Sequence, residues 1–135
     1  MEETKMKKLL LMLVMGVVML GCGKKLNLSD VAGKEFILKS PLGEYSITLK
    51  VEADGRVNGF SGVNRYMGAV EIKDGKVKFN DGMAGTMMAG PDEKMKAEAE
   101  YTKTLLEAES ATYKDGKLAF KIKGGKTLEF EEVKE

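Results

Sequence analysis

Histidine and tryptophan are both absent from this sequence. Without histidine, the chain cannot form a Ser-His-Asp triad or a zinc site with histidine ligands. Any general base would have to be a carboxylate or a lysine whose pKa is strongly shifted in a cleft. We therefore expect no enzymatic activity, no bound metal and no cofactor.

Cysteine occurs only once, at Cys22, so no internal disulfide can form and the fold must be stabilised by its core alone. Before this cysteine, Lys7-Lys8 precede an apolar run from Leu9 to Leu20, which is followed by Gly21. A positively charged segment, then an apolar segment, then a small residue is the order typical of a secretory signal peptide. The apolar run is shorter than the roughly 20 residues that a membrane-spanning helix needs. Residues 1–21 are therefore predicted to be a cleaved signal, with translation starting at Met1 or at Met6.

The segment Met19-Leu20-Gly21-Cys22 resembles the lipobox, after which a dedicated peptidase cuts and the cysteine thiol carries lipid. We expect acyl chains on Cys22 to hold the protein at a membrane surface outside the cytoplasm. Gly23 in place of an acidic residue favours, by resemblance to sorted lipoproteins, the outer membrane if the cell has one. The alternative is a plain secretory signal with an incidental cysteine.

The charge of the mature chain gives no sign of nucleic-acid binding. Residues 1–21 contain three of the 22 basic side chains and two of the 21 acidic ones, so 19 of each remain and the net charge is zero. A nucleic-acid binder is expected to show a basic excess or a basic stripe. Nucleic acid is therefore not an expected partner. The expected partners are the membrane, through acyl chains on Cys22, and a protein or other envelope component, and the domain is expected to be a monomer.

Most of the mature chain has the alternating pattern of half-buried strands. Tyr45, Ile47, Leu49 and Val51 alternate with polar residues, and similar runs recur later. Between the runs lie dipeptides that favour tight hairpin turns, namely Asp54-Gly55, Asp74-Gly75, Asp115-Gly116 and Gly124-Gly125. Residues 22–32 lack a sustained pattern and are predicted to be a tether to a domain at 33–135.

One helix is predicted, from Pro91 to about Glu109, because this stretch lacks internal glycine and proline. Its expected apolar face is formed by Met95, Ala99, Thr102 and Leu106. The predicted fold class is α+β, with a curved antiparallel sheet or small open barrel of about eight strands and the amphipathic helix packed against it.

Several residues that suggest chemistry have simpler structural interpretations. Ser61 stands in a segment like a nucleophile elbow but is interpreted as a turn serine, because no histidine can activate it. The methionines at 67, 83, 87, 88 and 95 suggest a site for a soft metal such as monovalent copper, but are interpreted as side chains that fill gaps in the core. The acids Asp92, Glu93, Glu98 and Glu100 alternate with lysines and are predicted to form a solvated helix face.

The glycine-rich loop that contains Asn64, Arg65 and Tyr66 is the candidate binding loop. Arginine is rare in this chain, and its planar fork suits carboxylate or phosphate. Arg65 therefore either binds a ligand or holds the loop against the barrel. We expect Asn64 to hydrogen-bond backbone groups and Tyr66 to be at least partly buried.

The order of motifs in this chain resembles a META domain of the HslJ-like type, found in bacterial envelope lipoproteins. Residues 55–68 resemble that family's G-x-v-s-G-x-x-G-C-N-x-y-x-G segment, and residues 86–91 resemble its T-[RK]-M-A-C-P segment. Glu98 through Leu106 resembles the helix that follows, with its E-x-x-f-x-x-x-L spacing.

This sequence departs from the family pattern at both cysteine positions, which hold Val63 and Gly90, and Phe36 stands where tryptophan is frequent. Because both cysteines are missing together, we expect positions 63 and 90 to be neighbours, at the spacing of a disulfide. The resemblance implies a fold and an envelope location, with some members linked to stress responses, and no reaction. The expected function is that of a non-catalytic lipoprotein that supports envelope integrity or stress tolerance by binding a protein or surface component. The alternative is a carrier of a small apolar ligand in the barrel mouth.

Overall fold

The structure is a computed structural model that describes residues 25–80 and 83–134. Cys22 and the predicted signal peptide lie outside the described residues. The elements in chain order are α2 (Leu28–Val31), β1 (Glu35–Ser40), the 3-10 turn η1 (Gly43–Tyr45), β2 (Thr48–Val51), β3 (Arg56–Phe60), β4 (Arg65–Lys73), β5 (Lys76–Phe79), β6 (Ala84–Gly85), α3 (Asp92–Leu106), β7 (Ala108–Lys114), β8 (Lys117–Ile122) and β9 (Thr127–Glu132).

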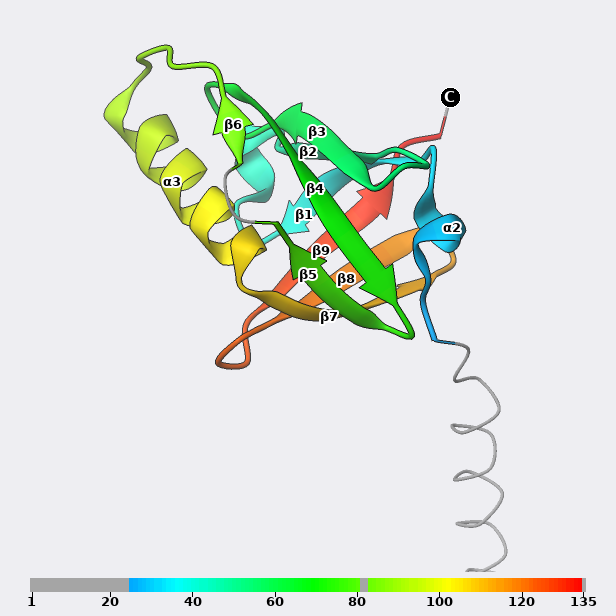
Figure 1. Ribbon diagram of the computed structural model, residues 1–135. Helices are drawn as coiled ribbons and strands as arrows, with labels where there is room; N and C mark the ends of the chain where they lie inside the picture. The colour runs from blue at the N-terminus through cyan, green and yellow to red at the C-terminus, as the bar shows by residue number, and fades with distance from the viewer. Residues whose placement is uncertain (1–24, 81–82, 135) are drawn as a thin grey trace, which may run out of the picture.

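The strands form an antiparallel barrel in the order β3-β2-β1-β9-β8-β7-β5-β4, and pairing between β3 and β4 closes it (Figure 1). The closing pairs run from Arg56 opposite Ala69 to Phe60 opposite Arg65. The two-residue strand β6 pairs with Tyr66 and Met67 of β4, on the edge of β4 opposite β3. The predicted α+β class is confirmed, and the barrel is closed rather than open.

Tight turns join neighbouring strands at the predicted dipeptides. Asp74 and Asp115 have φ of 52°, and the glycines that follow them have φ of 80° and 77°. Two successive residues with positive φ form the turn whose twist matches two-residue hairpins. The Asp-Gly pairs thus join β4 to β5 and β7 to β8 as expected.

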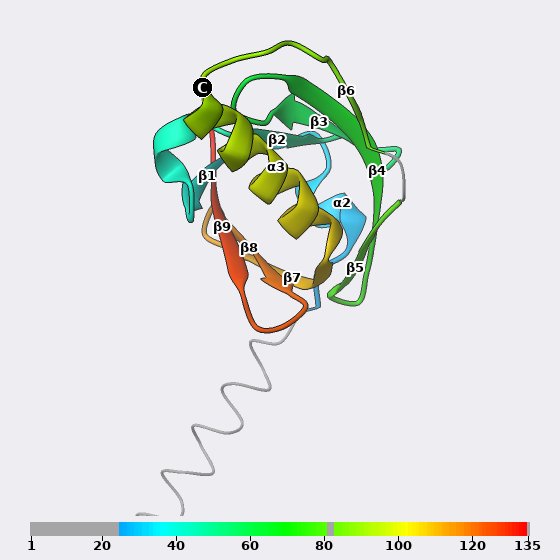
Figure 2. The ribbon, with the colours of Figure 1, turned by 90° about the vertical axis from the view of Figure 1, so that its left-hand side faces the viewer.

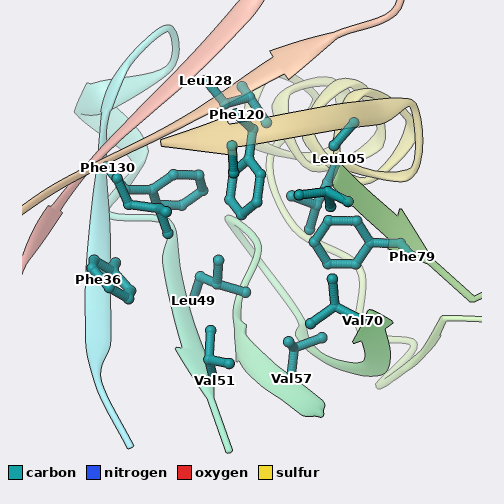
Figure 3. Packing of buried hydrophobic residues seen from close by; sticks show 14 of the residues in the cluster. Phe36, Leu49, Val51, Val57, Val70, Phe79, Leu105, Phe120, Leu128 and Phe130 are labelled. Carbon is teal, nitrogen blue, oxygen red and sulfur yellow. The ribbon is translucent and has the colours of Figure 1, made fainter. Parts of the chain in front are cut away.

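Side chains fill the barrel interior, as Figure 3 shows. Phe36, Phe120 and Phe130 are almost completely buried. The Phe120 ring packs edge-on against Phe130 at 5.7 Å between centroids and against Phe79 at 5.8 Å. Such pairs add packing energy to the burial of apolar area. The interior is therefore a packed core built from the apolar rows of the strands.

Helix α3 lies across one end of the barrel (Figure 2). The predicted helix is confirmed, but its predicted apolar face is wrong. Its buried residues are Ala97, Tyr101 and Leu105, whereas Ala99 and Leu106 are exposed. Both sets of residues have helical spacing. The set with Tyr101 is buried because the Tyr101 ring packs in the core, where its hydroxyl lies within hydrogen-bond distance of the Tyr66 hydroxyl.

The opposite end of the barrel is covered by the N-terminal segment, which was predicted to be a tether. Leu26 and Val31 are buried in the core, and the Leu26 carbonyl accepts a hydrogen bond from the Gly75 backbone N–H (2.7 Å). The described part of this segment therefore belongs to the folded domain. It lies beside β5 and β7, the two neighbouring strands with the fewest paired residues in the barrel. Among the described residues they share only the Lys76–Ser110 pair.

Candidate functional site

A single carboxylate joins α3 to the loop between β3 and β4. The Glu98 Oε1 accepts hydrogen bonds from the Ser61 hydroxyl (2.6 Å) and the Asn64 backbone N–H (2.6 Å). It also accepts one from the Val63 backbone N–H (3.2 Å), while Oε2 accepts one from the Asn64 side-chain amide (2.9 Å). The prediction that Glu98 lies on a solvated face is therefore wrong, although Glu100 on the same helix is exposed.

The environment of Glu98 favours its ionised form. Burial raises the pKa of this carboxyl, but the hydrogen bonds from Ser61, Asn64 and Val63 outweigh burial and hold the pKa below its usual value. Hydrogen bonds to a carboxylate stabilise the charged form. Glu98 is thus a charged anchor for the loop across the physiological pH range.

We predict that Glu98 contributes to the acid sensitivity of the fold. Its pKa is lower in the folded than in the unfolded state, so its stabilisation is present above the unfolded pKa and is lost as pH falls through the folded pKa. In Glu98→Gln, the free energy of unfolding should fall less steeply than in wild type as pH drops below about 4.3. At neutral pH the substitution should lower the free energy of unfolding by roughly 1–3 kcal/mol, because the loop donors lose their charged acceptor.

The measurement is the free energy of urea unfolding across the acid range, with Glu100→Gln as the matched control on the exposed side of α3. The control should follow the wild-type profile. Parallel acid profiles for Glu98→Gln and wild type would contradict the assignment.

Asn64 is the second centre of this network and is only 6 % exposed. Its side-chain Oδ1 accepts hydrogen bonds from the Met88 backbone N–H (2.6 Å) and the Thr86 hydroxyl (2.8 Å). Its Nδ2 donates to Glu98 Oε2 and to the Met88 carbonyl (3.1 Å). All four hydrogen-bonding positions of the amide are thus used, which confirms the expected backbone hydrogen bonds and joins the loop to residues 86–88 and to α3.

Tyr66 lies inside the barrel end, 3 % exposed, as expected from the sequence. Its hydroxyl lies 2.7 Å from the Thr48 carbonyl and 2.6 Å from the Tyr101 hydroxyl. Because the carbonyl can only accept, Tyr66 donates to Thr48 and Tyr101 donates to Tyr66. Burial raises the pKa of both phenols, so both remain protonated. This pair fixes α3 to the core of the barrel.

Glycines allow the loop to approach its neighbours closely. Gly62 has φ of 127°, which L side chains rarely adopt, and a Cβ there would lie 3.6 Å from the Glu98 Cβ. A Cβ on Gly59 would meet the Thr48 carbonyl oxygen and the Tyr66 ring. The glycines of this segment therefore serve the packing of α3 and β2 against the loop.

Arg65 differs from its two neighbours because its side chain is exposed. Its backbone N–H donates to the Thr86 hydroxyl (3.1 Å) and its carbonyl accepts from the Thr86 N–H (3.0 Å), so the backbone is held in place. Within residues 25–80 and 83–134, its guanidinium forms no ion pair. Of the three predicted loop residues, only Arg65 is thus available to a ligand.

Met67, Met87 and Met88 are exposed, which corrects the prediction that they fill the core, whereas Met83 is partly buried and packs against the core as predicted. Met67, two residues after Arg65 along β4, is 58 % exposed, Met87 is 97 % exposed and Met88 is 61 % exposed. The Thr86 backbone and hydroxyl are hydrogen-bonded to the Arg65 backbone, and Met87 and Met88 follow Thr86 directly in the chain. We call Arg65, Met67, Met87 and Met88 the Arg65 surface.

In the described part of the chain, no three acidic, histidine or cysteine side chains cluster as metal ligands would. None of the helices in residues 25–80 and 83–134 has the length and apolar character needed to cross a membrane.

Comparison with protein families matches the META domain over residues 20–135. The chain belongs to the META domain family. A search of curated proteins finds no match.

The META fold of this chain is similar to that of three solved structures. An NMR structure of a protein from Burkholderia xenovorans is 24% identical, with a TM-score of 0.66, covering 80% of this chain and 87% of that one. A second NMR structure is 18% identical, with a TM-score of 0.62 and coverages of 78% and 94%. A crystal structure of a DUF4847 family protein from Bacteroides vulgatus is 16% identical, with a TM-score of 0.55 and coverages of 79% and 97%. At these identities the likeness shows the fold alone.

The two META motif segments meet in space, as the paired cysteine positions predicted. A Cβ built on Gly90 would lie 3.5 Å from the Val63 Cβ, at the short end of the range for disulfides. It would also lie 2.8 Å and 3.0 Å from the Val63 methyl carbons, so the valine occupies the space of a side chain at position 90. The prediction that positions 63 and 90 are neighbours is confirmed.

Proposed function

We propose that this META domain is a lipid-anchored, non-catalytic protein of the cell envelope that supports envelope integrity or stress tolerance by binding a protein partner. In this proposal Cys22 carries the acyl chains outside the cytoplasm, on the outer membrane where the cell has one. The observation that carries the proposal is the Arg65 surface. There an exposed arginine without an ion pair among the described residues and three exposed methionines lie on two segments that hydrogen bonds between Arg65 and Thr86 join.

The Arg65 surface has the chemistry of a protein contact. Exposed apolar side chains that gather in one place are typical of interaction sites, and methionine adapts its shape to different partners. Arginine is enriched among the residues that contribute most binding energy. A partner that places a carboxylate among apolar side chains would complement this surface.

The geometry around Ser61 favours a role without catalysis. Ser61 is 1 % exposed, and its hydroxyl lies 2.6 Å from Glu98 Oε1 and 2.8 Å from the Asn64 carbonyl. The lowered pKa of Glu98 makes it a weak base. Both groups are therefore better suited to holding the loop than to attacking a substrate.

The packed interior argues against the alternative of a carrier. Tyr101 and Leu105 on α3 are fully buried at the barrel mouth, and aromatic rings fill the space below. A small barrel needs an unfilled interior to hold a ligand. An apolar ligand in the mouth would have to displace this helix.

We predict that replacing the arginine of the Arg65 surface impairs binding without affecting folding. Arg65→Ala should weaken partner binding about thirtyfold, as expected for loss of about 2 kcal/mol at a central arginine, and should abolish a stress-tolerance phenotype. Its melting temperature should be unchanged because the side chain is exposed.

Arg56→Ala is the matched control, since Arg56 is an exposed arginine on the adjacent strand β3 and forms an ion pair with Asp54. The partner, recovered by crosslinking from native membranes with a photoreactive group at position 87, should bind this variant normally. Equal effects of the two substitutions would refute a specific role for Arg65.

We predict that Cys22→Ala prevents lipid attachment. The variant should incorporate no labelled fatty acid and should move from the detergent phase to the aqueous phase, because two or three acyl chains are needed for stable membrane anchoring. Unchanged fatty-acid labelling of Cys22→Ala would exclude this residue as the attachment site.

A further inference from the structure

The end of the barrel opposite α3 is held close to the predicted lipid attachment site. The Leu26 carbonyl is bonded to Gly75, and the Asn27 side chain accepts a hydrogen bond from the Asp74 backbone N–H (3.0 Å). Only the four peptide units from Cys22 to Leu26 separate the thiol-bearing residue from this anchored point, and they span at most about 14 Å when fully extended. If Cys22 is acylated, the Asp74–Gly75 turn must therefore lie near the membrane surface.

Three lysines surround this turn. Lys73 and Lys76 are directly opposite each other across the β4–β5 hairpin, where like charges repel. The Cβ of Lys25 lies 3.9 Å from the position of a Cβ on Gly75. All three side chains are exposed, and none is in an ion pair within the described ranges. We call these three residues the basic hairpin.

A surface groove of about 940 Å³ opens beside the basic hairpin, between the N-terminal segment and β7. Lys25, Lys76 and Lys114 line it together with Leu26, Ala111 and Tyr113. Two carboxylates also line it, from Asp30 and Asp74, and Asp30 accepts a hydrogen bond from the Asn27 backbone N–H (2.8 Å). The groove thus combines apolar atoms with three ammonium groups, which outnumber the two carboxylates and can bind a phosphate.

We propose that the basic hairpin and this groove bind the headgroup of an anionic phospholipid in the membrane that carries the acyl anchor. This inference rests on the proposed lipid attachment at Cys22. The short connection to Cys22 selects the occupant, because it keeps the groove at the level of the headgroups. Lysines near an anionic surface attract it, and this attraction weakens with salt.

Headgroup binding would orient the domain on the membrane. Strand β4 runs from Arg65 to Lys73, eight residue steps that span about 26 Å. With Lys73 at the headgroups, the other end of β4 points away from the membrane. The Arg65 surface is then presented to partners in the surrounding compartment.

The test uses the lipidated protein in vesicles of phosphatidylcholine alone or of equal parts phosphatidylcholine and phosphatidylglycerol. Because lipid occupies Cys22, a second cysteine is the only free thiol. A fluorophore is placed at Thr112→Cys in the groove or at Met87→Cys on the opposite end, both exposed. Quenching by headgroup-attached quenchers should be several-fold stronger at position 112 than at 87 in the anionic vesicles, and high salt should reduce it.

Neutralising two of the three lysines of the basic hairpin, with Lys73→Gln and Lys76→Gln, should remove the dependence on phosphatidylglycerol. The matched control is Lys123→Gln with Lys126→Gln, which flank the β8–β9 turn beside α3. Equal quenching at position 112 in both kinds of vesicle, or the same response from both lysine pairs, would overturn the inference. Failure of the protein to float with phosphatidylcholine vesicles would instead refute the acyl anchor and, with it, this proposal's premise.

Discussion

Replacing Asn64 with alanine is expected to lower the free energy of unfolding by about 3 kcal/mol, since breaking a buried hydrogen-bond network leaves several groups unpaired. The Met88 backbone loses the amide partners of both its N–H and its carbonyl. The Thr86 hydroxyl and one Glu98 oxygen lose theirs as well. Water can reach residues 86–88 from outside, which keeps the expected loss near this value.

The loss is measured by urea unfolding, with Asn58→Ala as the control at a partly buried asparagine on β3. Asn64→Asp should also destabilise the protein, because it removes the amide donor and sets a second carboxylate 2.9 Å from Glu98 Oε2. A change below about 1 kcal/mol for Asn64→Ala, within the range of an ordinary surface substitution, would contradict the central role of this residue.

Restoring cysteines at positions 63 and 90 is expected to raise the free energy of unfolding by about 3–4 kcal/mol, through closure of a loop of roughly 28 residues. The substitutions Val63→Cys and Gly90→Cys are combined with Cys22→Ala, so that no third thiol interferes. The Cβ separation of 3.5 Å suits the bond, and the change at position 63 removes the valine methyl groups that crowd position 90.

The gain should disappear when the protein is reduced. Gly90→Ala alone should destabilise the protein, because its Cβ would lie 2.8 Å from a Val63 methyl carbon. Val63→Ala in the same chain should relieve that crowding. Two free thiols after oxidation, measured with a thiol reagent, would show that the motif segments are not neighbours as described.

The strands and turns were predictable because their signals are local. Alternation places Leu49 and Val51 inside the barrel, and Asp-Gly pairs supply the positive φ of the hairpins. Closure of the barrel was not predictable, because pairing between β3 and β4 on one side and between β1 and β9 on another depends on the curvature of the whole sheet. The sequence therefore predicted the fold class but not whether the ring is complete.

The site was harder to predict because its key contacts are long-range. Glu98 and Glu100 have the same chemistry and similar sequence surroundings, yet only Glu98 meets the loop, more than thirty positions earlier in the chain. The sequence signal that could have identified Glu98 was its spacing from Tyr101, which matches the E-x-x-f pattern of the META family helix. The prediction failed for Met67, Met87 and Met88 because apolar character alone does not show whether a side chain faces the core. Strand alternation from the buried Tyr66 would have placed Met67 on the outside of the barrel.

Pairing of β1 with β9 also determines when the chain can fold. Both ribosomes and export channels release a chain from its N-terminal end, so β1 cannot pair with β9 until residues 127–132 have emerged. Contacts between distant parts of a chain form slowly because a long loop must close first. The barrel must therefore fold after residues 127–132 have emerged, and until then the apolar rows of its early strands depend on chaperones or on dilution to avoid aggregation.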